Sequence, residues 1–217
     1  MLTPPVFDPA HARLTLSLAA TDYAQQVMVV PFLARLRVEA PGVRVAVRGE
    51  DLALMTPDSA PPGLHARHLF DETYVVAMRD GHPDAGEGVL SLDRFCDLDH
   101  ALVSLAGGGF HGVTDEALAA MGRERRVVLS VGSFLVLAQV LRTTDLVAVV
   151  PCRLALGAPG LTMRAPPVAV PGFAKVMVWH DRTHHDPAHR WLRDLLLRTS
   201  QPMAPPTDVS PESRSAP

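Results

Sequence analysis

The stretch RLTLSLAATDYAQQVMVVPFLARLRVEAPGVRVAV, residues 13–47, decides the fold. Its first segment, RLTLSLAA, predicts a β-strand. A helical run follows from Tyr23 to Glu39 and ends at Pro41-Gly42, and the segment VRVAVR predicts the next strand. A strand, a helix and a strand in turn predict a βαβ unit, and so an α/β fold.

The rest of the chain continues this alternation. After the strand DLALM, the sequence ARHLFDETYVVAMR ends in a buried strand, and DGHPDAGEG, residues 80–88, breaks the pattern and predicts a crossover. Further helices are predicted over residues 91–98, 113–121 and 134–142, and further strands over 100–106, 125–131 and 146–151. A last strand segment, VAVPGFAKVMVWH, precedes a helix that Asp186 caps and Pro187 opens.

Composition limits the classes of function. A chain of 217 residues with 47% hydrophobic residues can bury one core or two small lobes that share a cleft. A net charge of -3 and a pI near 6.3 argue against a nucleic-acid-binding surface. Cys96 and Cys152 are too far apart for a disulfide framework or a CxxC metal pair, which suits a reducing cytoplasm. No signal peptide and no apolar run of roughly 20 residues is present, so we expect neither export nor a membrane span.

Three strand-to-helix junctions could hold a ligand. Thr21 or Asp22 can cap the first helix, Ser133 can cap the helix that begins at Phe134, and the loop AGGGFHGVTDEAL joins a strand to a third helix. Such junctions cluster at the carboxyl ends of the strands in an open α/β sheet. The unpaired N–H groups of a helix N-terminus favour an anion such as a carboxylate.

The loop also spells G-x-G-x-x-G, with Gly107, Gly109 and Gly112. A dinucleotide site would need an acidic residue about 20 residues onward at the end of the next strand, where this chain has Gly132-Ser133. We therefore favour a loop that lets backbone approach a small anion. His111 in this loop either contacts the ligand or only caps and solvates the turn.

The segment WHDRTHHDPAH, residues 179–189, contains four histidines, but His185 precedes the helix cap, so it does not share a helical face with His189. We expect an exposed histidine-rich turn and no metal site. No nucleophile motif is present, and Ser104 and Ser133 are interpreted as polar or capping residues.

Five segments, taken together and in order, carry a resemblance to a family: LTLSLAATDYAQQVMVVPFLARLRVEAPGVRVAV, HLFDETYVVAMRDGHP, GFHGVTDEALAAMG, TTDLVAVVPCRLA and WHDRTHHDPAHRWLRDLL. The chain resembles the effector-binding domain of LysR-type transcriptional regulators, most of all the branch that responds to aromatic and nitroaromatic acids. The resemblance implies a type 2 periplasmic-binding-protein fold with two Rossmann-like lobes around a cleft. The expected organisation is a linker over 1–11, lobe I over 12–80 and 168–200, lobe II over 81–167, and a disordered tail over 201–217.

The resemblance also implies a function. We expect a cytoplasmic sensor, not an enzyme, that binds a small aromatic or carboxylate effector and forms a homodimer, without a cofactor or a membrane partner. We expect the effector to contact Thr21, Asp22, Gly109, His111, Ser133 and Phe134. The resemblance places Thr21 and Asp22 at the family's first-lobe cleft position and His111 on a histidine that the aromatic-acid branch uses to contact effector. Ser133 departs from the family, because that branch often has another histidine at this position. The family contacts DNA through an N-terminal winged helix-turn-helix that we expect to be absent from this chain. Two alternatives are a fragment that antagonises dimerisation of a full-length relative, and a nucleotide-dependent enzyme that uses the Gly107–Gly112 loop.

One departure from the family concerns VRVAVRGEDLALM, residues 43–55. The family joins these two strands, which are parallel, by a helix that is missing here, and parallel neighbours need a crossover of a dozen or more residues. Gly49 can take the positive φ of a type II′ turn. We therefore predict an antiparallel hairpin or an unpaired edge, in a first lobe that is less stable than the second.

Overall fold

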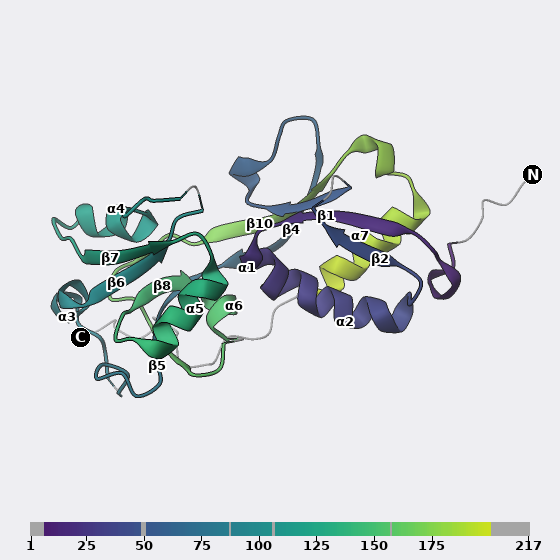
Figure 1. Cartoon of the computed structure of the whole chain (residues 1–217). Coiled ribbons are helices and arrows are strands. Elements are labelled where there is room, and N and C mark those ends of the chain that lie inside the picture. The colour runs from purple at the N-terminus through teal and green to yellow at the C-terminus, as the bar shows by residue number, and fades with distance from the viewer. Residues whose placement is uncertain (1–6, 49–50, 87, 106, 157, 201–217) are drawn as a thin grey trace, which may run out of the picture.

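The computed structural model describes residues 7–48, 51–86, 88–105, 107–156 and 158–200. The expected tail over 201–217 and the turn at Gly49-Glu50 lie outside these ranges. The chain forms two α/β lobes that lie side by side (Figure 1). None of the helices that the structure describes is long and apolar enough to cross a membrane.

The first lobe is built on a five-stranded sheet. Its strands are β1 (Thr15–Ala20), β2 (Arg44–Val47), β3 (Leu52–Met55), β4 (His65–Glu72) and β10 (Phe173–Trp179). Their order across the sheet is β2-β1-β3-β10-β4. β1 is parallel to both β2 and β3, whereas β10 is antiparallel to β3 and β4.

Helices of the first lobe pack on this sheet around one apolar core. The helical run after β1 consists of α1 (Asp22–Ala24), a π-helical turn (Gln25–Val29) and α2 (Val30–Glu39). Pro31 explains the π turn, because proline has no N–H to donate and its ring crowds the carbonyl one turn earlier. The last helix, α7 (Pro187–Thr199), is capped as predicted, since the Asp186 carboxylate accepts from His189 N at 2.8 Å.

The predicted hairpin at residues 43–55 is wrong. β2 pairs with the first half of β1, where Val47 faces Leu18, and β3 pairs with the second half on the opposite side, where Leu52 also faces Leu18. The chain therefore passes from one side of β1 to the other, a distance of about 10 Å, and continues in the same direction. No helix lies between Val47 and Leu52 among the residues described, and none is needed, because the strands are staggered along β1 and are not neighbours.

The second lobe contains two sheets that one bridge connects. Its strands are β5 (Tyr74–Arg79), β6 (Asp99–Val103), β7 (Arg126–Val131), β8 (Ala148–Pro151) and β9 (Leu161–Arg164). One sheet has the order β8-β5-β9 and the other the pair β6-β7, and a parallel bridge between His100 and Val147 joins β6 to the start of β8. The combined order β7-β6-β8-β5-β9 repeats the topology of the first lobe, with β5 in the place of β10.

Helices cover both faces of this combined sheet. They are α3 (Leu92–Asp97), α4 (Val113–Ala119), α5 (Phe134–Thr143) and α6 (Cys152–Leu156). Separate apolar clusters pack around Leu137 and Leu141 of α5 and around Phe95 of α3 and Leu118 of α4. Short 3-10 turns occur at Pro9–His11, Pro57–Ser59 and Asp181–Thr183.

The chain changes lobes earlier than the family resemblance implied. We expected β5 in lobe I, but it pairs with β8 and β9 of the second lobe, so the first crossing falls at Thr73. Val168, which we also placed in lobe I, packs in the core of the second lobe, and the return crossing precedes β10. At Gly172 a Cβ atom would lie 2.2 Å from the carbonyl oxygen of Glu72, so only glycine lets the two crossing segments approach this closely.

Candidate functional site

Two helix starts from different lobes are joined by hydrogen bonds. Asp22, the first residue of α1, accepts at Oδ2 from the hydroxyl of Ser133 at 2.8 Å and from Leu135 N at 3.4 Å. Ser133 is the N-cap of α5 and its oxygen accepts from Val136 N at 3.3 Å, while Thr21 caps α1. Figure 1 shows α1 and α5 in contact at the junction of the lobes. The Asp22 carboxylate therefore occupies the positive end of α5.

Aromatic rings from both lobes lie next to these helix starts. The ring of Tyr23 lies 5.9 Å from that of Phe134 in the second lobe and 6.0 Å from that of Phe173 at the start of β10. Phe173 in turn lies 5.6 Å from Tyr74 at the start of β5. These four rings, together with Glu72 and Lys175, form what we call the interlobe cluster. Ring contacts of this kind suit the burial of a planar apolar group.

Glu72 accepts hydrogen bonds from residues of both lobes. It is 2% exposed, and its carboxylate accepts from the Tyr23 hydroxyl, from Thr73 N at 3.0 Å and from Arg153 N of α6 at 3.4 Å. Burial raises the pKa of Glu72 above its usual value, although these three donors act to lower it. Burial also raises the pKa of Tyr23, and the Glu72 charge adds to that effect.

Lys175, the one lysine of the chain, lies on β10 within the same cluster. It is only 6% exposed, and its Nζ lies 5.4 Å from the ring centre of Tyr23 and 5.6 Å from that of Phe173. Burial lowers its pKa, and the attraction of Glu72 only partly offsets this. Among the described residues no hydrogen bond or ion pair reaches this ammonium group.

The glycine-rich loop lies at the end of β6, on the surface of the second lobe. Gly107 and Gly108 have positive φ angles of 85° and 72°, which explains the choice of glycine there. The Gly109 carbonyl accepts from Ser130 of β7 at 2.6 Å. His111 is exposed, and within the described ranges no hydrogen bond connects it or Gly109 to Asp22 or Ser133.

A network of hydrogen bonds and one ion pair fixes the end of this loop at Gly112, where α4 begins. Asp115 accepts from Gly112 N at 2.8 Å and makes a bidentate pair with Arg125, with both distances 2.8 Å. Burial alone would raise the pKa of Asp115, but the bonds and charge of Arg125 outweigh it and lower the pKa. Arg125 donates to His100 Nδ1 at 3.3 Å, and His100 Nε2 donates to the Phe95 carbonyl at 2.7 Å. Burial lowers the pKa of His100 to about 4, so the imidazole is neutral at pH 7.

The histidine-rich turn is a stacked surface structure. His184 stacks on His65 with ring centres 3.9 Å apart and accepts from Trp179 Nε1 at 3.2 Å. Arg193 lies over Trp179 and donates to the carbonyls of Thr183 and His184. Over the part of the chain that the structure describes, no three His, Cys, Asp or Glu side chains are arranged to hold a metal ion.

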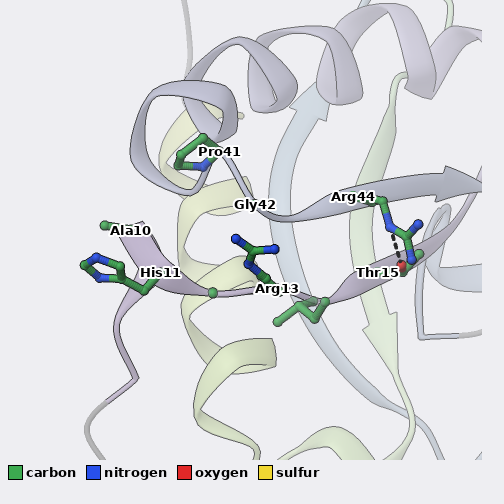
Figure 2. Close-up of a pocket in the computed structure, with 9 residues that line it drawn as sticks. Ala10, His11, Arg13, Thr15, Pro41, Gly42 and Arg44 are labelled. Carbon is green, nitrogen blue, oxygen red and sulfur yellow. Dashed lines mark hydrogen bonds between the residues drawn. The ribbon is translucent and has the colours of Figure 1, made fainter.

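A hollow of about 560 Å³ lies elsewhere, at the amino ends of β1 and β2. Figure 2 shows that His11, Arg13 and Arg44 line it beside the Pro41-Gly42 turn, with Arg44 bonded to Thr15. Ligands of open α/β sheets bind at the opposite, carboxyl ends of the strands. We therefore place the candidate site at the interlobe cluster and not in this hollow.

The structure brings together Thr21, Asp22, Ser133 and Phe134. Over the described ranges, no hydrogen bond links Gly109 or His111 to them. It adds Glu72 and Lys175, which the sequence reasoning missed. A signal for both was present, since each is a charged residue next to or within an apolar strand segment, FDETYVVAM and AKVMVW.

Comparison with known proteins gives consistent matches. The family model of the LysR substrate binding domain matches residues 9–201. The chain is 32% identical over 208 residues to the HTH-type transcriptional activator NagR of a Ralstonia species, a match that covers 88% of this chain and 68% of NagR. It is 34% identical to the HTH-type transcriptional regulator SyrM 1 of Sinorhizobium fredii, with 87% of this chain and 60% of that relative covered.

A solved structure agrees with these matches. The regulatory domain of MexT, a transcriptional activator in Pseudomonas aeruginosa, superposes with a TM-score of 0.74 at 31% identity, covering 85% of this chain and 99% of that domain. These relatives are transcriptional regulators, which removes the alternative of a nucleotide-dependent enzyme at residues 107–112.

Proposed function

Because the chain belongs to the LysR substrate binding domain family, we propose that its two lobes close on a small aromatic carboxylate and that this closure controls transcription. The observation that carries the proposal is the bond between Asp22 of the first lobe and Ser133 of the second, at 2.8 Å. A hydrogen bond between lobes forms only when the lobes are close. A ligand that prefers this closed form would shift the equilibrium toward it.

The composition of the interlobe cluster supports an aromatic ligand with a charged end. Tyr23, Phe134, Phe173 and Tyr74 supply ring faces from both lobes. Lys175 supplies a buried positive charge. The resemblance to the aromatic-acid branch of the family favours the same class of effector. We keep Gly109 and His111 as predicted contacts on the second lobe, which a larger effector would reach.

We also propose a homodimer in the cytoplasm, where regulators of transcription meet DNA. The resemblance pairs the first helix and second strand of one subunit with the second lobe of its partner. In this chain α2 exposes Val30 and Val38, and α5 exposes Leu135 and Val136, so both surfaces offer apolar area. We assign DNA contact to a winged helix-turn-helix and not to these lobes, since the chain carries a net charge of -3. Light scattering that finds a monomer at all concentrations would contradict the dimer.

A binding panel tests the ligand class. Benzoate, naphthoate and nitrobenzoates are each titrated by calorimetry, beside their neutral amides and an aliphatic acid such as acetate. We expect aromatic acids to bind, to raise the melting temperature and to lower the radius of gyration in small-angle scattering. Phe134→Ala is expected to weaken aromatic acids about tenfold, whereas Val128→Ala, an exposed β7 residue, serves as the control. A panel in which no aromatic acid binds the wild-type protein would refute the proposed function.

A further inference from the structure

We propose that the ammonium group of Lys175 anchors the carboxylate of the effector. This assignment rests on the proposed function and names a residue and a polarity for its site. Lys175 lies at the third position of β10, the strand that follows the return crossing between the lobes. The side chain is thus attached to the segment that lobe closure moves.

The first argument is the missing acceptor. A buried ammonium group has three donors and is normally hydrogen-bonded or paired with an anion. Only 6% of Lys175 is exposed, although its Nζ still reaches solvent, and the described residues give the ammonium group only the ring faces of Tyr23 and Phe173. A carboxylate is the ligand group that would supply both the charge and the lone pairs this site lacks.

The second argument excludes Glu72 as a close partner. The Glu72 carboxylate already accepts from the Tyr23 hydroxyl, Thr73 N and Arg153 N, and no ion pair with an N–O distance within 4.0 Å joins these two described residues, Glu72 and Lys175. Burial lowers the pKa of Lys175, and the attraction of Glu72 raises it by less than burial lowers it. The Lys175 charge is therefore only weakly compensated inside the protein.

The third argument is orientation. The rings of Tyr23 and Phe173 lie under the ammonium group, and Tyr23 also contacts Phe134 of the second lobe. An effector ring stacked in this cluster would thus present its acid group to Lys175. The acid group would avoid the Asp22 end, where a carboxylate already bonds Ser133 and would repel it. A hydrogen-bond donor on the effector suits that end.

The test compares Lys175→Met and Lys175→Arg with the wild-type protein, using benzoate and its neutral analogue benzamide. We expect Lys175→Met to weaken benzoate about 10- to 100-fold, the range for a lost charged hydrogen bond, and to leave benzamide unchanged. Lys175→Arg is expected to recover at least part of the benzoate affinity. Equal loss of benzoate and benzamide would show a packing role and overturn the assignment, as would unchanged benzoate binding.

A single lysine allows a direct readout. Labelling the protein with lysine carrying carbon-13 at Cε gives one resonance from Lys175. We expect benzoate, but not benzamide, to raise the midpoint of its pH titration. An unchanged midpoint on saturation with benzoate would overturn the anchor. If the wild-type protein binds no aromatic acid, the proposed function itself is wrong. If the wild-type protein and the Lys175→Met variant bind benzoate with equal affinity, only the assignment of Lys175 is wrong.

Discussion

Replacing Ser133 by alanine is expected to destabilise the second lobe and to open the two lobes, because one hydroxyl serves both. Its oxygen accepts from Val136 N at the start of α5, and its proton goes to the Asp22 carboxylate of the first lobe at 2.8 Å. The two roles have different consequences. Loss of the cap lowers the stability of α5, while loss of the second bond changes the balance between open and closed forms.

The magnitudes follow from these two contacts. Loss of a serine N-cap costs about 1 kcal/mol. A hydrogen bond to a carboxylate contributes roughly 1.5 to 3 kcal/mol, and the lower end applies here because the bond between Ser133 and Asp22 is only partly buried. The total is about 2.5 kcal/mol of unfolding free energy. The interlobe share, about 1.5 kcal/mol, corresponds to roughly a tenfold shift toward the open form.

A double-mutant cycle separates the two shares. Ser133→Ala, Asp22→Ala and the double variant are unfolded in urea, and the radius of gyration of each is measured by small-angle scattering. The expected coupling energy is about 1.5 kcal/mol, with an increased radius in all three variants. Ser133→Thr keeps the hydroxyl and serves as the control. Purely additive losses, with no change of radius, would mean that the bond does not hold the lobes together.

Three further predictions concern the crossing between the lobes at Gly172, the second lobe and the sheet of the first lobe. Gly172→Ala places a Cβ atom 2.2 Å from the Glu72 carbonyl oxygen and is expected to lower the melting temperature by several degrees. Gly132→Ala serves as the control, because its Cβ atom would meet no neighbour within 4 Å. Equal melting temperatures of the two variants would contradict the close approach at Gly172. His100 has a folded pKa of about 4 against about 6.5 when unfolded, so its contribution is complete above pH 6.5 and is lost as the pH falls toward 4. Between pH 7 and pH 4.5 this loss amounts to roughly 2 kcal/mol of unfolding free energy, and a His100→Gln variant with the same acid sensitivity would refute it. Finally, the amides of Arg44–Val47 are expected to exchange faster than those of Arg126–Val131, because among the described residues a helix follows only the second of these equivalent edge strands. Equal protection of the two strands would count against a weaker first lobe.

Local patterns carried most of the fold. The strand, helix and strand over residues 13–47 were predicted within two residues of their observed bounds. The spacing of apolar residues and the end of the helix at Pro41-Gly42 are local signals that a sequence shows directly. α6 and β9 were missed, since five- and four-residue elements give no measurable period. The predicted antiparallel pairing of β2 with β3 was wrong for a different reason. Local sequence shows that two strands are close in the chain, but not that a third strand, β1, lies between them.

The site divided along the same line. That Thr21 and Ser133 cap the helices after β1 and β7 was predictable, because capping residues that follow strands are local signals. That Asp22 would bond Ser133 could not be predicted, since 111 residues separate them. Glu72 and Lys175 belong to β4 and β10, which are adjacent only because the chain returns to the first sheet after completing the second. Their shared cluster is a product of topology.

In the proposed site, the repeated topology gives the two lobes different groups to offer a ligand. β7 and β8 lie on either side of β6 and are joined by α5, whose N-terminus offers N–H groups to an anion. The equivalent strands of the first lobe, β2 and β3, lie on either side of β1 without such a helix among their described residues. In the proposed site the first lobe contributes side-chain charges, Asp22 from the start of α1 and Lys175 from β10. Because Asp22 already fills the N-terminus of α5, the proposed site directs an acid group toward Lys175 on β10, the strand that follows the return crossing between the lobes.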